Sequence, residues 1–295
     1  MKLISICVPV FNEENNIENL IKKIDIFFQK LKSKYTYEIL FTDNCSQDNT
    51  AEIIKKNSMK NKKIKYIKFE KNIGYDLSVF YNLLSSNGDA SIVIDCDLQD
   101  PIEMISDFLS YWEKGYDLVY GIRVRKNEEN FFYLFRKFFY LILNKFSLKK
   151  YPLYAGDFRI IDKKIIRKFR KLKNEPIITR CISYDYSNNS YGIPYNRKPR
   201  KYDESKYPFA KALLYALNTF VLKTHFFEKI FFYIYLAIIL MGINFFFFKI
   251  KLLFLSILLT ISFLINILFL TFKKILKEKH YKKKLSLNVK ERINI

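Results

Sequence analysis

The chain has 295 residues, of which 50% are hydrophobic and 18% aromatic, so it can bury the core of an α/β domain and still carry a further segment. This composition excludes a disordered chain. The formal net charge is +22, but no stacking or groove-reading motif accompanies it, and we expect no nucleic-acid partner. The four cysteines form no C-x-x-C pair and there are two histidines, which predicts reduced thiols and argues against a zinc site.

Short apolar runs alternate with stretches of helical periodicity in the first part of the chain. The runs at 3–8, 38–42, 64–69, 91–95 and 117–120 predict five strands, with helices between them. The first strand begins almost at Met1, so we expect no signal peptide. Strands and helices that alternate in this way imply right-handed crossovers and a largely parallel sheet.

Acidic side chains follow the predicted strands. Asp95 and Asp97 come directly after the fourth strand and project to the same side of an extended backbone, and Gln99 adds a neutral oxygen. Glu13 and Asp43 follow two other strands, at the edge where open α/β sheets bind ligands. A few hard oxygen ligands suit Mg²⁺ or Mn²⁺ that also holds phosphate. A solvated loop is the alternative for the acidic triplet taken alone.

Pro101 predicts the start of a helix, because proline is favoured at the first helical position. We expect Asp100 to cap this helix. The stretch 131–146 mixes many aromatic residues with Arg136, Lys137 and Lys145, which favours a helix that lies in a membrane interface over one in the core.

Two apolar runs follow, at 230–248 and 252–272, and each is long enough to cross a hydrocarbon core of about 30 Å. Their short connector predicts a transmembrane hairpin, with two buried helices of a soluble domain as the alternative. The residues after 272 hold nine lysines and arginines against two glutamates. This asymmetry predicts a multi-pass protein of the inner (cytoplasmic) membrane with the catalytic domain and both termini in the cytoplasm.

Six motifs occur in a fixed order: Pro9-Val-Phe-Asn-Glu13, Asp43-Asn-Cys-Ser46, Asn72-x-Gly74, Asp95-x-Asp97-Leu-Gln-Asp-Pro101, Tyr120-Gly-x-Arg123 and Gly156-Asp157-Phe-Arg159. Together they resemble the family 2 glycosyltransferases of GT-A fold, in particular the polyprenyl-phosphate branch related to dolichyl-phosphate mannose synthase, over about residues 3–272. The resemblance implies a GT-A catalytic domain with a mostly parallel sheet at 1–160, an acceptor or lid region with interfacial helices at 161–229, the two-helix hairpin at 230–272 and a basic cytoplasmic tail at 273–295.

The resemblance also implies roles for residues on the donor side. Pro9, Phe11 and Glu13 would line the pocket of the nucleotide base, and Asp43 would hydrogen-bond the base; strand termination and core packing are the alternatives for Pro9 and Phe11. Asp95, Asp97 and Gln99 would hold Mg²⁺ or Mn²⁺ on the donor diphosphate. A basic segment that contains Arg197, Arg200 and Lys206 resembles a loop that closes over the donor, with an ordinary charged loop as the alternative.

On the acceptor side, Arg123 and Arg136 would bind the acceptor phosphate, and a lipid headgroup is the alternative partner of Arg136. Asp157 resembles the position proposed as catalytic base. A phosphate monoester is already anionic and needs little proton removal, so Asp157 could equally orient the acceptor or Arg159.

We therefore expect a metal-dependent enzyme that transfers a sugar, with inversion, from a nucleotide-sugar donor to a polyprenyl phosphate, and so supplies a lipid-linked sugar for cell-envelope glycans. Membrane lipids and a second copy of the chain are its other expected partners. The alternatives are a transferase of the same fold with a glycan, protein or diacylglycerol acceptor, and a non-catalytic membrane scaffold. The chain departs from the family pattern at Asn44-Cys45, where Asp-Gly is usual, and at Tyr75, where a basic residue is common.

Overall fold

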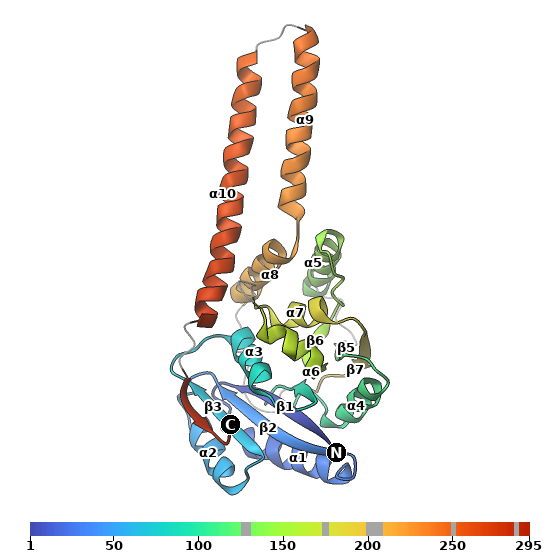
Figure 1. Ribbon diagram of the computed structural model, residues 1–295, viewed down its shortest axis with the longest axis vertical. Helices are drawn as coiled ribbons and strands as arrows, with labels where there is room; N and C mark the ends of the chain where they lie inside the picture. The colour runs from blue at the N-terminus through green and yellow to red at the C-terminus, as the bar shows by residue number, and fades with distance from the viewer. Residues whose placement is uncertain (125–130, 173–176, 199–208, 249–251, 286–288) are drawn as a thin grey trace.

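The computed structural model describes residues 1–124, 131–172, 177–198, 209–248, 252–285 and 289–295. Within its helices, the side chains at 131–133, 135–136, 209–212, 238–248, 252–257, 259 and 279–285 are outside the description. Figure 1 shows a sheet with helices on both faces and two long helices, α9 and α10, that extend away from it.

The described strands form one eight-stranded sheet in the order β7-β5-β6-β4-β1-β2-β3-β8. Their bounds are β1 (Lys2–Val10), β2 (Tyr35–Asp43), β3 (Ile64–Phe69), β4 (Ala90–Val93), β5 (Leu118–Arg123), β6 (Ala155–Asp162), β7 (Ser190–Tyr195) and β8 (Val289–Ile293). The central pairs β4-β1, β1-β2 and β2-β3 are parallel, while β6 and β8 pair antiparallel to their neighbours. The predicted α/β class with a mostly parallel sheet is confirmed.

The helices are α1 (Ile17–Lys30), α2 (Thr50–Lys60), α3 (Tyr75–Ser85), α4 (Ile105–Glu113), α5 (Phe131–Phe146), α6 (Lys163–Arg170), α7 (Thr179–Tyr186), α8 (Phe209–Lys223), α9 (Phe226–Phe248) and α10 (Leu252–Leu285). Each early helix buries one apolar stripe; in α1 this stripe includes Leu20, Ile24 and Phe28. The helix predicted from Pro101 begins as a short 3₁₀ turn, Ile102–Met104, and continues as α4.

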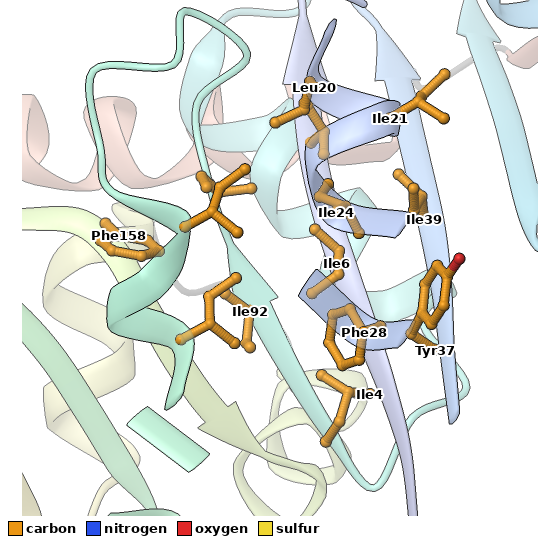
Figure 2. Close-up of a cluster of buried hydrophobic side chains, with 14 of the residues drawn as sticks. Ile4, Ile6, Leu20, Ile21, Ile24, Phe28, Tyr37, Ile39, Ile92 and Phe158 are labelled. Carbon is orange, nitrogen blue, oxygen red and sulfur yellow. The ribbon is translucent and has the colours of Figure 1, made fainter. Parts of the chain in front are cut away.

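Neighbouring strand residues face opposite sides of the sheet and so build two cores. In β1, Ile6 belongs to the core under α1, α2 and α4, whereas Cys7 belongs to the core under α3, α6 and α7. Figure 2 shows the first core, in which Phe28 of α1 packs beside the side chains of β1 and β2. Both faces of the central strands are covered, which explains why these strands are almost continuously apolar.

The two predicted apolar runs form a helical hairpin. Phe227 of α9 contacts Phe269 of α10, with ring centroids 4.5 Å apart, and Lys273 binds Glu228 near the base of the hairpin. In the part of the chain that the structure describes, no helix combines the length and apolarity needed to cross a membrane. The helices of the predicted hairpin are therefore confirmed, but their transmembrane character is not supported.

Three strands lie where the sequence analysis expected none. β6 lies between β4 and β5 in the sheet and pairs antiparallel with both. β7 falls within 161–229, the region assigned to an acceptor or lid segment, and it joins the catalytic sheet beside β5. β8 falls within 273–295, the predicted basic tail, and it pairs antiparallel with β3. Glu291 of β8 also forms a 2.6 Å salt bridge with Lys55 of α2. The end of the described chain is thus part of the catalytic sheet.

Candidate active site

Several strand ends meet at one edge of the sheet. β1, β2, β4, β5 and β7 all point the same way, whereas β6 runs in the opposite direction. The carboxyl ends of the first group therefore lie beside the start of β6. This arrangement brings Asp43, Asp95, Arg123 and Asp157 to one edge, although they are far apart in the sequence.

The loops after β1 and β2 are tied together on the side predicted for the nucleotide base. The backbone N–H of Asn12 donates to Ser46 Oγ at 3.0 Å, and the N–H of Glu13 donates to Thr50 Oγ1 at 2.8 Å. Phe11 is 36% exposed at this edge, and Pro9 lies in β1 just before it. A partly exposed aromatic ring beside a fixed loop is a surface on which a base could stack. The predicted roles of Pro9, Phe11 and Glu13 stay predictions.

Asp43 is fully buried at the end of β2. Its Oδ2 accepts a 2.8 Å hydrogen bond from the Tyr66 hydroxyl, and its Oδ1 accepts a 2.7 Å bond from the backbone N–H of Ser46. The carboxylate therefore supports the loop after β2, and its predicted hydrogen bond to a base stays a prediction.

The residues that replace the usual Asp-Gly pair have clear structural consequences. The Asn44 amide donates to Asn72 Oδ1 at 3.0 Å and its Oδ1 accepts from the backbone N–H of Ile73 at 2.8 Å. A carboxylate could not make the first of these bonds. Cys45 has φ +70°, in the left-handed region that glycine adopts most readily.

The loop after β4 presents an acidic cluster, which we define as Asp95, Asp97 and Asp100. Arg197, just beyond β7, reaches all three carboxylates. Its Nη2 lies 3.1 Å from Asp95 Oδ2 and 3.6 Å from Asp97 Oδ2, and its Nε lies 3.1 Å from Asp100 Oδ1. Tyr75, the other departure from the family pattern, donates its hydroxyl to Asp95 Oδ1 at 2.8 Å. These five residues lie together at the sheet edge.

The role predicted for Asp100 as a helix cap is wrong. The 3₁₀ turn that begins at Ile102 has no side-chain cap. Asp100 instead accepts a 2.5 Å hydrogen bond from the Tyr195 hydroxyl as well as the bond from Arg197. The sequence analysis did not identify β7, which places Tyr195 and the following Arg197 beside Asp100. Asp100 bonds to these two side chains and does not cap the helix.

Two members of the acidic cluster, Asp95 and Asp97, are placed as a pair of cation ligands would be. Asp95 and Asp97 aim at the same guanidinium nitrogen, so their oxygens already converge on one positive charge. Burial raises the pKa of Asp95, the carboxylates of Asp100 and Asp157 raise it further, and Arg197 opposes them. Among the described residues, no group of three or more His, Cys, Asp or Glu side chains is arranged as a metal site on its own. Gln99 Nε2 donates to the backbone carbonyl of Lys198. The Gln99 side chain and a ligand diphosphate would complete the coordination of the cation.

Asp157 lies at the start of β6 within an arginine cluster, which we define as Arg123, Arg159 and Arg180. Its Oδ1 pairs with Arg159 and its Oδ2 lies 2.6 Å from Arg180 Nη2. Burial would raise the pKa of Asp157, but the guanidinium groups of Arg180 and Arg159 outweigh it and hold the pKa well below the usual range. Such a carboxylate is a poor proton acceptor, so the geometry favours the orienting role over the role of base.

Arg123 links the two clusters. Its Nε lies 3.3 Å from the Tyr195 hydroxyl, which in turn binds Asp100. The side chain passes directly over Gly156, where an added Cβ would come within 2.9 Å of Arg123 Nε. The side chain of Arg136 in α5, and the whole of Arg200 and Lys206, lie outside the described residues.

The sequence analysis did not identify Arg180. The signal for Arg180 is its place between Ile178 and Cys181, which are both buried. A charge in an apolar stretch needs a partner. Arg197 was identified only as part of a basic loop. Its place opposite the acidic cluster depends on β7 and could not be read from local sequence.

Comparisons with known proteins give independent information on the family. Residues 5–170 match the sequence profile described as Glycosyl transferase family 2. YkcC of Bacillus subtilis (strain 168), an uncharacterized glycosyltransferase, is 31% identical over 226 residues, which are 75% of this chain and 68% of that protein. A bactoprenol glucosyl transferase of Shigella phage SfV is 33% identical over 207 residues, which are 69% of this chain and 66% of that protein.

A solved structure supports the fold. The glucosyl-3-phosphoglycerate synthase from Mycobacterium tuberculosis, in complex with Mn²⁺, uridine diphosphate and phosphoglyceric acid, superposes with a TM-score of 0.51. The match covers 75% of this chain and 77% of that one at 15% identity, so it confirms the GT-A-like α/β fold and nothing more specific. From the sequence profile and the relatives together, the chain belongs to glycosyl transferase family 2.

Proposed function

We propose that this glycosyltransferase moves a sugar, with inversion, from a nucleotide diphosphate to a polyprenyl phosphate. The observation that carries the proposal is the contact between the acidic cluster and the arginine cluster through Arg123, Tyr195 and Asp100. One cluster suits a metal-bound diphosphate and the other suits a phosphate, so a sugar between them would face a leaving group and an anionic nucleophile. The similarity to bactoprenol glucosyl transferases supports the class of acceptor.

On the donor side, Asp95, Asp97 and Gln99 would hold Mg²⁺ or Mn²⁺, which supplies Lewis-acid stabilisation of the departing diphosphate when bound. The fold neighbour from Mycobacterium tuberculosis was solved with Mn²⁺ and uridine diphosphate, which supports a divalent metal and a nucleotide as ligands of this chain. Pro9, Phe11, Glu13 and Asp43 form the wall assigned to the base. Arg200 and Lys206 are proposed to close over the diphosphate.

On the acceptor side, Arg123 and Arg136 would bind the phosphate of the lipid and hold its oxygen in line with the sugar. The phosphate oxygen attacks the anomeric carbon from the face opposite the diphosphate, so the configuration inverts. The phosphate is already ionised at neutral pH and no general base is needed. Positioning of the two substrates supplies much of the rate enhancement.

Gly156→Ala should weaken binding of the acceptor without unfolding the protein. The new methyl group would come within 2.9 Å of Arg123 Nε and 3.1 Å of its Nη2, so the flexible end of that side chain must move. We expect the KM for polyprenyl phosphate to rise several-fold while the KM for the nucleotide sugar stays constant. Steady-state kinetics with each substrate varied in turn measure this split. An unchanged acceptor KM in Gly156→Ala, beside a raised one in Arg123→Ala, would contradict the placement of Arg123.

Arg197→Gln should strengthen metal binding in the absence of nucleotide. Arg197 forms ion pairs with Asp95 and Asp97, so a cation must displace its guanidinium before these carboxylates can serve as ligands. Removing this competitor is expected to increase the affinity for Mn²⁺ about tenfold, which corresponds to about 1.4 kcal/mol. Electron paramagnetic resonance of free Mn²⁺ measures this affinity directly. A variant that binds Mn²⁺ more weakly than the parent protein would exclude the competition.

We also propose that the protein acts at the cytoplasmic face of the inner membrane, with the α9–α10 hairpin entering the lipid and both termini on the cytoplasmic side. Exposed apolar side chains on α5 and α10 support contact with lipid: Leu134, Phe138, Leu141, Leu264 and Leu268 are each more than half exposed. Basic residues near the end of α10 suit the anionic cytoplasmic leaflet. Recovery of the protein only in the soluble fraction of lysed cells would contradict this location.

The transfer itself is tested with purified full-length protein, Mg²⁺ or Mn²⁺, undecaprenyl phosphate and a panel of UDP and GDP sugars. We expect one donor to give a lipid-linked sugar that is absent when the metal is chelated. Product with a glycan, protein or diacylglycerol acceptor, and none with the lipid phosphate, would favour the alternative transferase. Absence of metal-dependent nucleotide binding would favour a non-catalytic scaffold.

A further inference from the structure

Arg180 is fixed both through its side chain and through the helix that contains its backbone. Its side chain donates from Nη2 to Asp157 Oδ2 at 2.6 Å. Its backbone belongs to α7, whose first residue, Thr179, donates from both its N–H and its hydroxyl to Asp76 Oδ1 at 2.9 and 2.7 Å. A carboxylate at the N-terminus of a helix also matches the helix dipole. The guanidinium of Arg180 therefore has a defined position at the edge of the arginine cluster.

The two arginines that bind Asp157 are not equivalent. Arg159 is 1% exposed. It donates hydrogen bonds to the backbone carbonyls of Asp157, Thr179 and Arg180 and to Asp157 Oδ1. The side chain of Arg180 is 33% exposed, and its buried Nε has no hydrogen-bond acceptor among the described residues. Arg159 thus acts as an internal support, whereas the Arg180 side chain is one-third exposed and could contact a ligand.

The exposed part of the Arg180 guanidinium is where the arginine cluster could bind an anion. Arg159 and Arg180 share the carboxylate of Asp157, while Asp100 lies near Arg123 and Asp76 lies near Arg180. A phosphate group could accept hydrogen bonds from the exposed part of Arg180. A guanidinium can offer a planar pair of donors to such a group.

The surroundings of Arg180 indicate what the anion is attached to. Tyr140 of α5 lies close to Arg180, and Tyr215 of α8 donates its hydroxyl to Asp76 Oδ1 at 3.4 Å, the oxygen that Thr179 also binds. The same two helices carry exposed apolar side chains, Leu141 on α5 and Leu214 on α8. An anion with an apolar chain could place its charge on Arg180 and its chain along these helices.

We infer that Arg180 is a further binding residue for the phosphate of the lipid acceptor, and that Asp157 is the positioning residue that aims it. This inference rests on the proposed function and names one more residue of its acceptor site. The alternative is that Arg180 serves only as counter-ion of Asp157, in which case its loss would affect stability and not the choice of substrate.

The test compares the full-length wild-type protein with Arg180→Gln and with Arg167→Gln, a control that removes an exposed arginine on α6. We expect Arg180→Gln to raise the KM for undecaprenyl phosphate at least tenfold and to change the KM for the donor less than twofold. Arg167→Gln should change neither. A raised donor KM, or two unchanged KM values, would overturn the inference.

Arg180→Lys covers the case in which the glutamine variant does not fold, because it keeps the positive charge for Asp157 but loses the planar pair of donors. Direct binding of undecaprenyl phosphate and of uncharged undecaprenol, in the same detergent micelles, gives the preference for the phosphate. In the lysine variant, the ratio of affinities for undecaprenyl phosphate and undecaprenol should be about tenfold lower than in the wild-type protein. A ratio equal to that of the wild-type protein would contradict the role of Arg180. A wild-type protein with no preference would instead refute the proposed function, and the inference with it.

Discussion

Asp97→Ala is expected to reduce the rate of sugar transfer at least about a thousandfold, because a bound metal contributes several kcal/mol to stabilising the departing charge and each 1.36 kcal/mol corresponds to a tenfold change in rate. The Asp97 side chain is 9% exposed and points at the same guanidinium nitrogen as Asp95. Its removal would leave Asp95 as the one remaining carboxylate ligand proposed for the metal. Turnover with saturating donor and acceptor measures the loss.

Two measurements make this result specific. Asp107→Ala removes an exposed carboxylate from α4 and should retain full activity. Titration with Mn²⁺ should show weaker binding in Asp97→Ala and not in Asp107→Ala, with both variants keeping the circular dichroism of the parent. Undiminished turnover in a folded Asp97→Ala protein would remove the basis for the metal assignment.

Asp157→Asn is expected to cost about 3–5 kcal/mol of unfolding free energy, because it leaves two guanidinium groups without their buried counter-ion. It should also raise the acceptor KM, since Arg180 would no longer be held. Urea unfolding measures the first effect and steady-state kinetics the second. Asp107→Asn is the matched control and should change neither quantity.

The pH dependence of stability gives a second test of Asp157. Its pKa is lower in the folded than in the unfolded protein, so its contribution is complete above an unfolded value of about 4 and is lost as the pH falls toward the folded pKa. Between about pH 5 and pH 2, the wild-type protein should therefore lose more unfolding free energy than Asp157→Asn. Parallel curves for the two proteins over this range would mean that Asp157 is not paired as described.

The sequence predicted the parts of the site that depend on strand ends. Asp95 and Asp97 follow a predicted strand, so their place at the sheet edge followed from the order of strands and helices. Asp157 was named from the family resemblance alone, because β6 was not among the predicted strands. Arg180 and the partners of Asp100 could not be predicted in this way. Their positions depend on α7 and β7, which reach the edge through contacts between residues distant in the sequence, and neither segment has a strong local pattern.

The last strand shows the same limit. The segment 289–293 is short and strongly polar. It pairs antiparallel with β3, a strand from the early part of the chain. Periodicity and charge described this region as a tail, because neither property reports which edge is available for pairing. The helices of the hairpin, in contrast, followed from the length of the apolar runs alone.

The pairing of β8 with β3 has a consequence for how the two parts of the molecule move. The hairpin is joined to the catalytic unit through α8 at one end and through β8 at the other, so the chain leaves the sheet and returns to it. A single covalent connection would let the catalytic unit swivel about it, whereas two connections restrict that rotation. The orientation of the sheet edge relative to the hairpin is therefore limited by the backbone itself.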